Sequence, residues 1–578
     1  MKQSRPGAFR GNLESLFEQE LRAIEEEKLL ARLWHQDVSL WPAGGAGPQH
    51  LQANLEFLGI PERLPQMVSR ALDADAESRL RGLTQRLVIF FGTIHYFSNA
   101  LLNLLPDEAR RECVVLESCH PADIRDGESR VNLRKTLVVL ANKSGYQVED
   151  HSVFLYFREK MQKETGQEEA GQFVAASGAN TFLASIASEY RFRFLLDLPA
   201  EILAPFCSVI SWGVLLSALA KLEPEVLRVA CRDMKKQYSD DAANTGNPAS
   251  ELAAFLSATS RAGRSFIHFL APAKLAPFAA GLCPLIATSL GKEEGGLFPV
   301  LHTMPCETEP FDAASSFVVL RSSAESDRSL EERIGELRAR GIPFLELWVA
   351  TPLDLLRETF RWQLALVLAA ARMRVNPFEP CDTRLPRTIA AGLLNELSTR
   401  RDALQRRPRI REGKLEVFAE GRTRLEISQL NLTECLATFF AHRNAARYAA
   451  LLIYIERTKE AEAVFVALKD QLTRALRIPV FLAWGPRTYD MYGCLLHGSS
   501  VPGLRMMVTA SSSSDLKIPG ANYSFDELYR ALALGQFEGL PERNGLALRI
   551  HLEAQTEEAL RQLQNVITNA LKRIPNVF

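Results

Sequence analysis

The chain has 578 residues, 47% of them hydrophobic and 24% charged, with a formal net charge of -1. This composition is ordinary for a globular protein, and the length is too great for one core, so we expect two or three domains. The near-zero net charge excludes a global electrostatic attraction to nucleic acid or to an anionic membrane, so we expect neither as a partner.

Nine cysteines are scattered along the chain, and none forms a CxxC pair. Their odd number and irregular spacing favour a reducing compartment and argue against a disulfide framework or a zinc ribbon. The first 20 residues hold no apolar stretch typical of a signal peptide. The most apolar runs, Phe206–Ala220 and Trp362–Ala371, are shorter than the roughly 18–20 residues of a membrane-spanning helix. We therefore expect a cytoplasmic protein in which these runs are core helices.

The N-terminal part, residues 12–35, has the periodicity of an amphipathic helix. From about residue 80, short apolar runs alternate with helix-length segments, which predicts βαβ units around a parallel sheet. A long apolar helix, Cys207–Leu222, is expected to close this first unit. The strands predicted for it are Leu87–Phe91, Cys113–Leu116, Thr136–Leu140, Phe173–Ala176 and Phe192–Leu196.

A polar loop, residues 238–251, precedes a second set of the same kind, which includes a helix over Leu355–Met373. Its predicted strands are Ser265–Leu270, Phe317–Leu320 and Phe344–Val349. Residues 400–424 then carry nine arginines and lysines. Such a segment could grip phosphates or could be a solvated connection between domains; the near-neutral chain favours the solvated connection.

A third α/β set begins near Tyr448, with helices near 459–477, 524–534 and 556–573. Its predicted strands are Ala450–Tyr454, Val480–Trp484, Leu504–Thr509 and Leu546–Leu552. The whole chain is thus predicted to be α/β. We expect five parts: an N-terminal helical segment (1–80), two three-layer α/β/α sandwich domains with parallel sheets (81–236 and 237–399), a basic linker (400–430) and a C-terminal α/β domain (431–578).

Several stretches, in order along nearly the whole chain, resemble glucose-6-phosphate isomerases, most closely the isomerase half of bifunctional transaldolase/isomerase proteins. The matching segments and the family patterns are 33–41 (W..D.sLW), 142–149 (SKSGTT.E), 285–293 (LIAESTGKE), 362–363 with 376–379 (WEFA…NPFD), 485–487 (GPR) and 518–525 (IPG..YSF). The resemblance implies two sugar-isomerase (SIS) domains, a sugar phosphate as ligand, and a monomer or homodimer. It also implies interconversion of glucose 6-phosphate and fructose 6-phosphate through an enediol, without a metal or organic cofactor.

Two loops of the family surround the phosphate. In the first, this chain keeps only the first glycine of the family's G-M-G-G-S-S, as Gly92. Bulky side chains follow it, where the backbone would have to approach a ligand closely. In the second, Lys143, Ser144 and Gly145 match, and Gln147 stands where the family has a hydroxyl residue. A Lys-Ser-Gly turn that opens a helix predicts an anion site, although an ordinary helix cap has the same residues.

The positions that carry out proton transfer in the family are mostly replaced. The glutamate base aligns with Thr288 and the arginine with Pro205, so neither a base nor a cation is kept there. The family's lysine aligns with Arg387, which keeps the charge but does not exchange a proton near neutral pH. The histidine position falls next to His497, and Glu293 follows Thr288 by about a turn; His497, Arg387 and Glu293 are therefore the candidate catalytic residues.

Three hypotheses follow. A pseudoenzyme would keep the fold to bind a sugar phosphate or a protein partner. An active aldose–ketose isomerase of glycolysis and gluconeogenesis would use a relocated base. An isomerase of another phosphosugar is the third hypothesis. We favour the first, because the framework motifs remain while several cooperating catalytic groups are lost.

Overall fold

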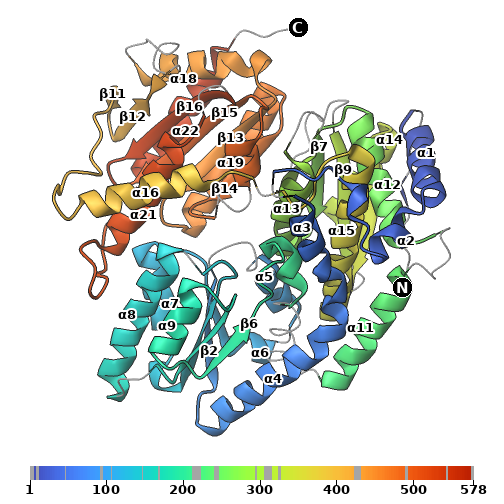
Figure 1. Ribbon diagram of the computed structural model, residues 1–578. Helices are drawn as coiled ribbons and strands as arrows, with labels where there is room; N and C mark the ends of the chain where they lie inside the picture. Colours follow the sequence, from blue (N-terminus) through green and yellow to red (C-terminus); the bar gives the residue numbers. More distant parts are fainter. Residues whose placement is uncertain are drawn as a thin grey trace.

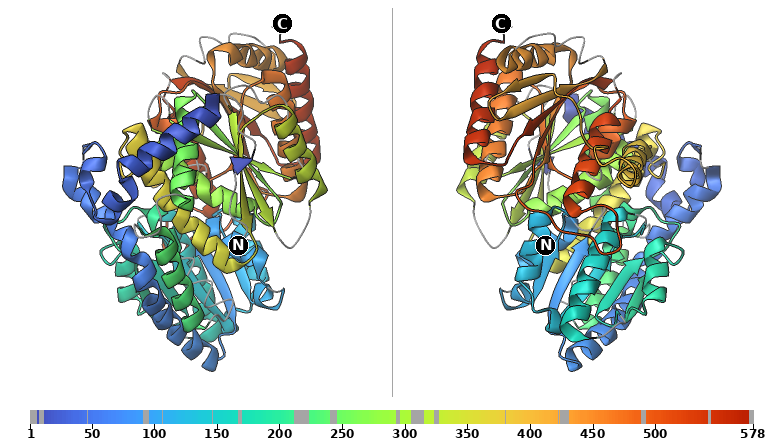
Figure 2. Two further views of the ribbon diagram at one scale, coloured as in Figure 1. Left: turned by 90° about the vertical axis from the view of Figure 1, so that its right-hand side faces the viewer. Right: turned by 90° about the vertical axis from the view of Figure 1, so that its left-hand side faces the viewer.

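The coordinates come from a computed structural model. It describes residues 6–7, 12–45, 47–90, 96–105, 107–145, 147–166, 170–210, 223–239, 246–292, 296–304, 315–322, 327–379, 381–421, 423, 431–487, 492–541 and 544–574. Figure 1 shows three β-sheets with helices beside them, and in both views of Figure 2 the C-terminal sheet lies above the first sheet. The predicted α/β class is thus confirmed.

The first sheet has five parallel strands in the order β3-β2-β4-β5-β6. Apolar runs of four to six residues form it, because buried parallel strands need side chains that are apolar on both faces. The strands are β2 (Gln85–Phe90), β3 (Cys113–Leu116), β4 (Thr136–Ala141), β5 (Phe173–Ser177) and β6 (Phe194–Asp197). The helices are α5 (Tyr96–Leu104), α6 (Asp107–Arg111), α7 (Pro121–Ser129), α8 (Val148–Thr165) and α9 (Phe182–Glu189).

The second sheet has the order β1-β10-β9-β7-β8, and only the two-residue β1 (Pro6–Gly7) is antiparallel. The other strands are β7 (Phe266–Ala271), β8 (Phe298–Thr303), β9 (Ser315–Ser322) and β10 (Phe344–Val349). The helices are α12 (Pro248–Arg261), α13 (Ala276–Leu290), α14 (Arg328–Ala339) and α15 (Pro352–Met373). A capping box of Thr351 and Asp354 opens α15, because the two side chains satisfy orphan amide groups reciprocally.

The third sheet has the order β11-β12-β16-β15-β13-β14. It is mixed, because β12 pairs antiparallel with both β11 and β16, whereas the other pairs are parallel. Its strands are β11 (Ile410–Glu412), β12 (Leu415–Ala419), β13 (Tyr448–Tyr454), β14 (Val480–Trp484), β15 (Gly503–Ala510) and β16 (Gly545–Leu552). The helices are α18 (Leu432–Ala441), α19 (Lys459–Leu476), α21 (Phe525–Glu538) and α22 (Glu557–Lys572). Part of the arginine-rich segment therefore belongs to a sheet.

All three sheets repeat one strand order. Numbered within each sheet, the parallel strands run 2-1-3-4: β3-β2-β4-β5 in the first, β8-β7-β9-β10 in the second and β14-β13-β15-β16 in the third. In open α/β sheets of this order, ligands bind outside the carboxyl ends of the strands where the order reverses. The fold therefore offers a ligand-binding edge on the third sheet as well as on the first two.

Further helices pack around this framework. The N-terminal segment forms α1 (Asn12–Glu26), α2 (Leu29–Trp34), α3 (Gly47–Leu55) and α4 (Ile60–Leu80), so the predicted single helix is divided at residues 27–28. Helix α1 contacts α12, and α4 contacts α11 (Pro224–Tyr238). Helix α16 (Arg384–Glu396) joins the second and third sheets and packs along α21 (Figure 1). Most of the predicted helix 207–222 lies outside the described residues.

The cysteine prediction is wrong at one place. Cys381 and Cys494 form a disulfide with their Cα atoms 5.4 Å apart, although 113 residues separate them in the chain. The fold brings the residues before α16 against the short helix η7 (Cys494–Gly498), a proximity that sequence spacing does not reveal. The other six cysteines of the described residues are free and buried. Among the helices that the structure describes, none is both long and apolar enough to cross a membrane.

Candidate functional site

The predicted phosphate loop follows β4, at the carboxyl edge of the first sheet. The side-chain oxygen of Asn142 accepts hydrogen bonds from the backbone amides of Ser144 and Gly145, at 3.1 and 3.3 Å, and from the Ser144 hydroxyl at 3.0 Å. Lys143 donates from Nζ to the carbonyl of Ala200 at 2.6 Å. The donors that would face a phosphate are therefore bound within the protein.

The surroundings of the loop also disfavour an anion. Asn142 donates to the buried Asp150 in the first turn of α8, which places a carboxylate beside the turn. Gly145 has φ +58°, and a Cβ there would lie 2.6 Å from Thr181 Oγ1, so the tight turn needs glycine. Gln147 is the N-cap of α8, without a side-chain cap bond, and Gly92 lies outside the described residues.

Arg387 is not a free cation. It extends from α16 and donates from Nη1 to both carboxylate oxygens of Glu149, at 3.0 and 3.3 Å. The Glu149 side chain is 1% exposed and the Arg387 side chain 30% exposed. Because leaving the buried Glu149 without a partner would be costly, this ion pair joins α8 to α16. The positive charge is kept at the matched position, but Glu149 accepts hydrogen bonds from it, so the guanidinium is not available to a ligand.

The remaining predicted positions do not meet in one site. Thr288 is partly buried on α13, and Glu293 lies outside the described residues. Pro205 is buried in the short helix η5 (Ala204–Cys207), and its carbonyl accepts a hydrogen bond from Nε2 of Gln363 at 3.1 Å. No carboxylate base is therefore found at the family's position in the part of the chain that the structure describes.

His497 lines a cavity of about 570 Å³ that also contacts Lys292 and Glu538. Its Nδ1 lies 3.2 Å from the carbonyl oxygen of Gly539, and its Nε2 is buried without a hydrogen-bond partner among the described residues. Burial lowers the pKa of His497 to about 4, so the ring is neutral at pH 7. Such a histidine binds a proton weakly and is a poor general base near neutral pH.

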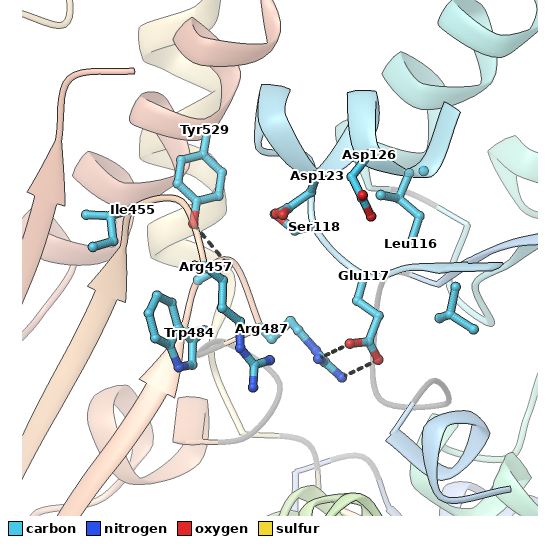
Figure 3. A pocket seen from close by; sticks show the side chains of 13 residues that line it. Leu116, Glu117, Ser118, Asp123, Asp126, Ile455, Arg457, Trp484, Arg487 and Tyr529 are labelled. Carbon is cyan, nitrogen blue, oxygen red and sulfur yellow. Dashed lines mark hydrogen bonds and ion pairs between the residues drawn. The ribbon is translucent and has the colours of Figure 1, made fainter. Parts of the chain in front are cut away.

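A different pocket, of about 170 Å³, lies between the first and third sheets (Figure 3). Its walls come from the carboxyl end of β3, from α7 and from the loops after β13 and β14. Arg487, after β14, donates to both carboxylate oxygens of Glu117, after β3, at 2.5 and 2.8 Å. Both side chains are largely buried, so this bidentate pair holds the two sheet edges together.

Asp123 is the carboxyl group in this pocket whose pKa is clearly shifted. Burial raises the pKa of Asp123 to about 6, and the carboxylate of Glu456 acts in the same direction; a hydrogen bond with Ser118 opposes them. Figure 3 shows Asp123 and Ser118 on the wall opposite Arg457 and Trp484. The guanidinium of Arg457 lies 5.5 Å from the centre of a Trp484 ring. A carboxyl group with this pKa can accept or donate a proton near neutral pH.

Sequence reasoning missed this pocket, although part of its signal was present. The GPR segment that contains Arg487 enters the sequence resemblance only as a framework motif, and Glu117 directly follows a predicted strand. Acidic and basic residues at the carboxyl ends of parallel strands are candidates for a site. Their pairing across two sheets, however, depends on how the sheets meet. No group of three or more potential metal ligands gathers among the residues the structure describes.

Comparisons with known proteins give a limited relationship. No family model matches the chain. A probable glucose-6-phosphate isomerase from Haloquadratum walsbyi (strain DSM 16790 / HBSQ001) is 24% identical over 237 residues, which are 41% of this chain and 54% of that protein. The match thus spans about half the length of the relative.

Two solved structures are similar to this chain. A hypothetical protein from Thermus thermophilus superposes with a TM-score of 0.55 at 16% identity, covering 68% of this chain and 99% of that chain. A glucose-6-phosphate isomerase from Chlamydia trachomatis D/UW-3/Cx has a TM-score of 0.49 at 15% identity, covering 68% and 87% of the two chains. The first of these likenesses shows the fold, and the sequence match supports a relationship with the glucose-6-phosphate isomerases.

Proposed function

We propose that this chain binds a sugar phosphate and does not isomerise it at the site used by glucose-6-phosphate isomerases. One contrast carries the proposal. The polar groups at the expected site bind one another, as in the pairs Arg387–Glu149 and Asn142–Ser144, whereas a pocket between the first and third sheets is lined by Ser118, Asp123 and Arg457. Burial raises the pKa of the Cys119 thiol, and the carboxylates of both Glu149 and Asp123 act in the same direction, so the two places lie within electrostatic reach of one residue.

The chemistry of the expected site supports the loss of isomerisation. An enediol mechanism needs a base that removes a proton from carbon and a cation that stabilises the charge that develops. Thr288 and Pro205 provide neither, and the guanidinium of Arg387 is already neutralised by Glu149. Loss of one general base alone typically costs a factor of about 10² to 10⁴ in rate.

The pocket between the first and third sheets is the place where we expect the sugar phosphate to bind. Ser118 and Asp123 offer oxygen atoms to sugar hydroxyl groups. Arg457 pairs with Glu462 at 2.6 Å, but both side chains are exposed, and its other guanidinium donors are offered to the phosphate. The groups lie at the carboxyl ends of strands from two sheets, the usual position of ligands in open α/β folds.

The first test is a coupled assay that detects glucose 6-phosphate formed from fructose 6-phosphate, together with a thermal-shift titration with the same sugar. We expect no turnover and a ligand-dependent rise in melting temperature. The variant Arg457→Gln should reduce the rise. The control Arg561→Gln, at an exposed arginine that also pairs with a glutamate, should leave it unchanged. Absence of any thermal shift would reject sugar-phosphate binding and leave a protein scaffold.

A second candidate function is an active isomerase in which Asp123 is the general base. The observation in its favour is the pKa of about 6, close to the value that suits proton transfer at neutral pH. Turnover that disappears in Asp123→Asn but persists in Asp126→Asn would establish it and contradict our proposal. Both residues line the pocket on α7, so the pair is a matched comparison.

A further inference from the structure

A separate pocket of about 250 Å³ lies at the carboxyl edge of the third sheet. Tyr454 ends β13, Thr509 and Ala510 end β15, and all three line it. The strand order of this sheet reverses between β13 and β15, so the pocket is at the place where open α/β sheets bind ligands. Its side walls come from α21 and from the arginine-rich segment before β12.

The pocket is strongly cationic. Four arginines line it, against one carboxylate, that of Glu416. Arg411 pairs with Glu416 at 2.7 Å, and Arg406 with Glu538 at 2.6 Å. Arg530 is 3.7 Å from Asp526, at the outer limit of an ion pair. The fourth arginine is Arg549. Because Glu538 and Asp526 do not line the pocket, the pocket itself faces an excess of positive charge.

Arg549 is the arginine of this pocket that is buried and has an unsatisfied hydrogen-bond donor. It is 6% exposed, and its guanidinium lies 3.7 Å from the centre of the Phe418 ring. Nη1 donates to the hydroxyl of Thr509 at 3.3 Å, but Nε is buried without a hydrogen-bond partner among the described residues. A buried charged donor left unsatisfied costs more than an ordinary lost hydrogen bond, so its retention calls for an acceptor.

The electrostatics of the neighbouring groups agree. Burial lowers the pKa of Arg549 to about 10; Arg406 and Arg530 act in the same direction, while Glu538 and Glu420 oppose it from a distance. Burial, Arg549 and Arg530 together lower the pKa of His551 to about 4. The imidazole is thus neutral at pH 7, and its two nitrogens lie near the hydroxyls of Thr509 and Ser511, at 2.9 and 3.2 Å. A bound anion would offset the repulsion among the arginines.

We propose that this pocket binds a phosphate group, either inorganic phosphate or the phosphate of a small monoester, with Arg549 and Arg530 as its main donors. Guanidinium groups donate to phosphate oxygens in a bidentate geometry, which makes arginine the usual residue for such sites. Arg406 and Arg411 would give two residues of the basic segment a binding role. The proposal uses residues of the third sheet and its flanking segments, and it holds whether or not the pocket beside Asp123 binds a sugar.

The test is isothermal titration of the full chain with sodium phosphate, at constant ionic strength with sodium chloride as the balancing salt. We expect saturable binding that weakens by about tenfold or more in Arg549→Met and in Arg530→Gln, since each removes charge-assisted hydrogen bonds. Arg407→Gln, at an exposed arginine of the same segment that does not line the pocket, should bind like the unaltered chain. If Arg549→Met does not fold, Arg530→Gln decides alone.

Titration with fructose 6-phosphate distinguishes the source of the phosphate, and fructose, which has no phosphate, is the control for binding of the sugar alone. Tighter binding of the monoester than of phosphate, lost in Arg530→Gln, would support a phosphorylated small molecule; equal or weaker binding would support inorganic phosphate. Absence of phosphate binding, or equal binding by the unaltered chain and both variants, would overturn the proposal. Arg457→Gln separates this result from the other pocket, because it should leave phosphate binding unchanged.

Discussion

At the scale of single residues, Arg387 and Glu149 illustrate what alignment to a family can and cannot provide. The sequence shows that a positive charge is kept at Arg387. It does not show that the charge meets a buried carboxylate 238 positions away in the chain. The same holds for Asn142, whose side-chain oxygen accepts the hydrogen bonds of Ser144 and Gly145 that a phosphate would otherwise accept. A residue's type follows from sequence, whereas its hydrogen-bond partners depend on long-range packing.

Asp123 provides a prediction at this scale. An acid whose pKa is raised by folding, here from 3.8 to about 6, holds its proton more tightly in the native state. The native state therefore binds more protons than the unfolded state between about pH 4 and 6, and the stability from this group falls as pH rises through that window. Asp123→Asn should remove this fall and increase the free energy of unfolding above pH 6 by about 1–3 kcal/mol.

Urea unfolding at pH 4, 5.5 and 7.5 measures this effect as the difference between the variant and the unaltered chain. Asp126→Asn is the control, since Asp126 is an exposed residue of the same helix. A difference that does not grow with pH would mean that the Asp123 carboxyl is not held in its neutral form by the fold.

At the scale of elements, the sequence predicted most strands, because each is a short apolar run between segments of helical length. Besides the short β1 and β11, it missed β8, in which Pro299 interrupts an otherwise apolar run, and β12, which lies among arginines. In both cases a local signal against a strand was overridden by pairing with a neighbouring strand, β7 or β16. Strand propensity is weak enough for such context to decide.

The contact between α16 and α21 gives a prediction for an element. Gly535 on α21 faces α16, where an added Cβ would overlap the carbonyl oxygen of Pro386 and lie 2.9 Å from the Cβ of Ala390. Gly535→Ala should therefore force the helices apart and lower the free energy of unfolding by about 1–3 kcal/mol. Chemical denaturation measures the change.

Gly392 on α16 is the matched control, because an added Cβ there meets nothing within 4 Å. Gly392→Ala should be neutral or should stabilise by about 0.5–1 kcal/mol, since alanine loses less backbone entropy in a helix. If both substitutions have the same effect, the helix contact is not as close as the structure has it.

At the scale of the whole molecule, the three sheets share one topology, and one of the hydrophobic clusters reaches all three. A single cluster of buried side chains includes Leu87 of the first sheet, Phe266 of the second and Tyr448 of the third. Phe266 and Phe481 lie with ring centres 6.3 Å apart, and Lys469 donates to the carbonyl of Leu301 in β8. Sequence predicted three α/β units but not this continuity, because it depends on contacts between residues far apart in the chain.

This continuity predicts that the third sheet does not unfold independently. Domains joined by small polar interfaces usually unfold in separate steps, whereas a shared apolar core couples them. We expect one calorimetric transition whose van't Hoff and calorimetric enthalpies agree. Hydrogen exchange in denaturant should then expose β4, β7 and β13 together, and Gly535→Ala should shift the whole transition. Two resolved transitions, with β13 exchanging first, would instead mean that the contacts at Phe266, Tyr448 and Lys469 contribute little, because losing the third sheet would leave the other two stable.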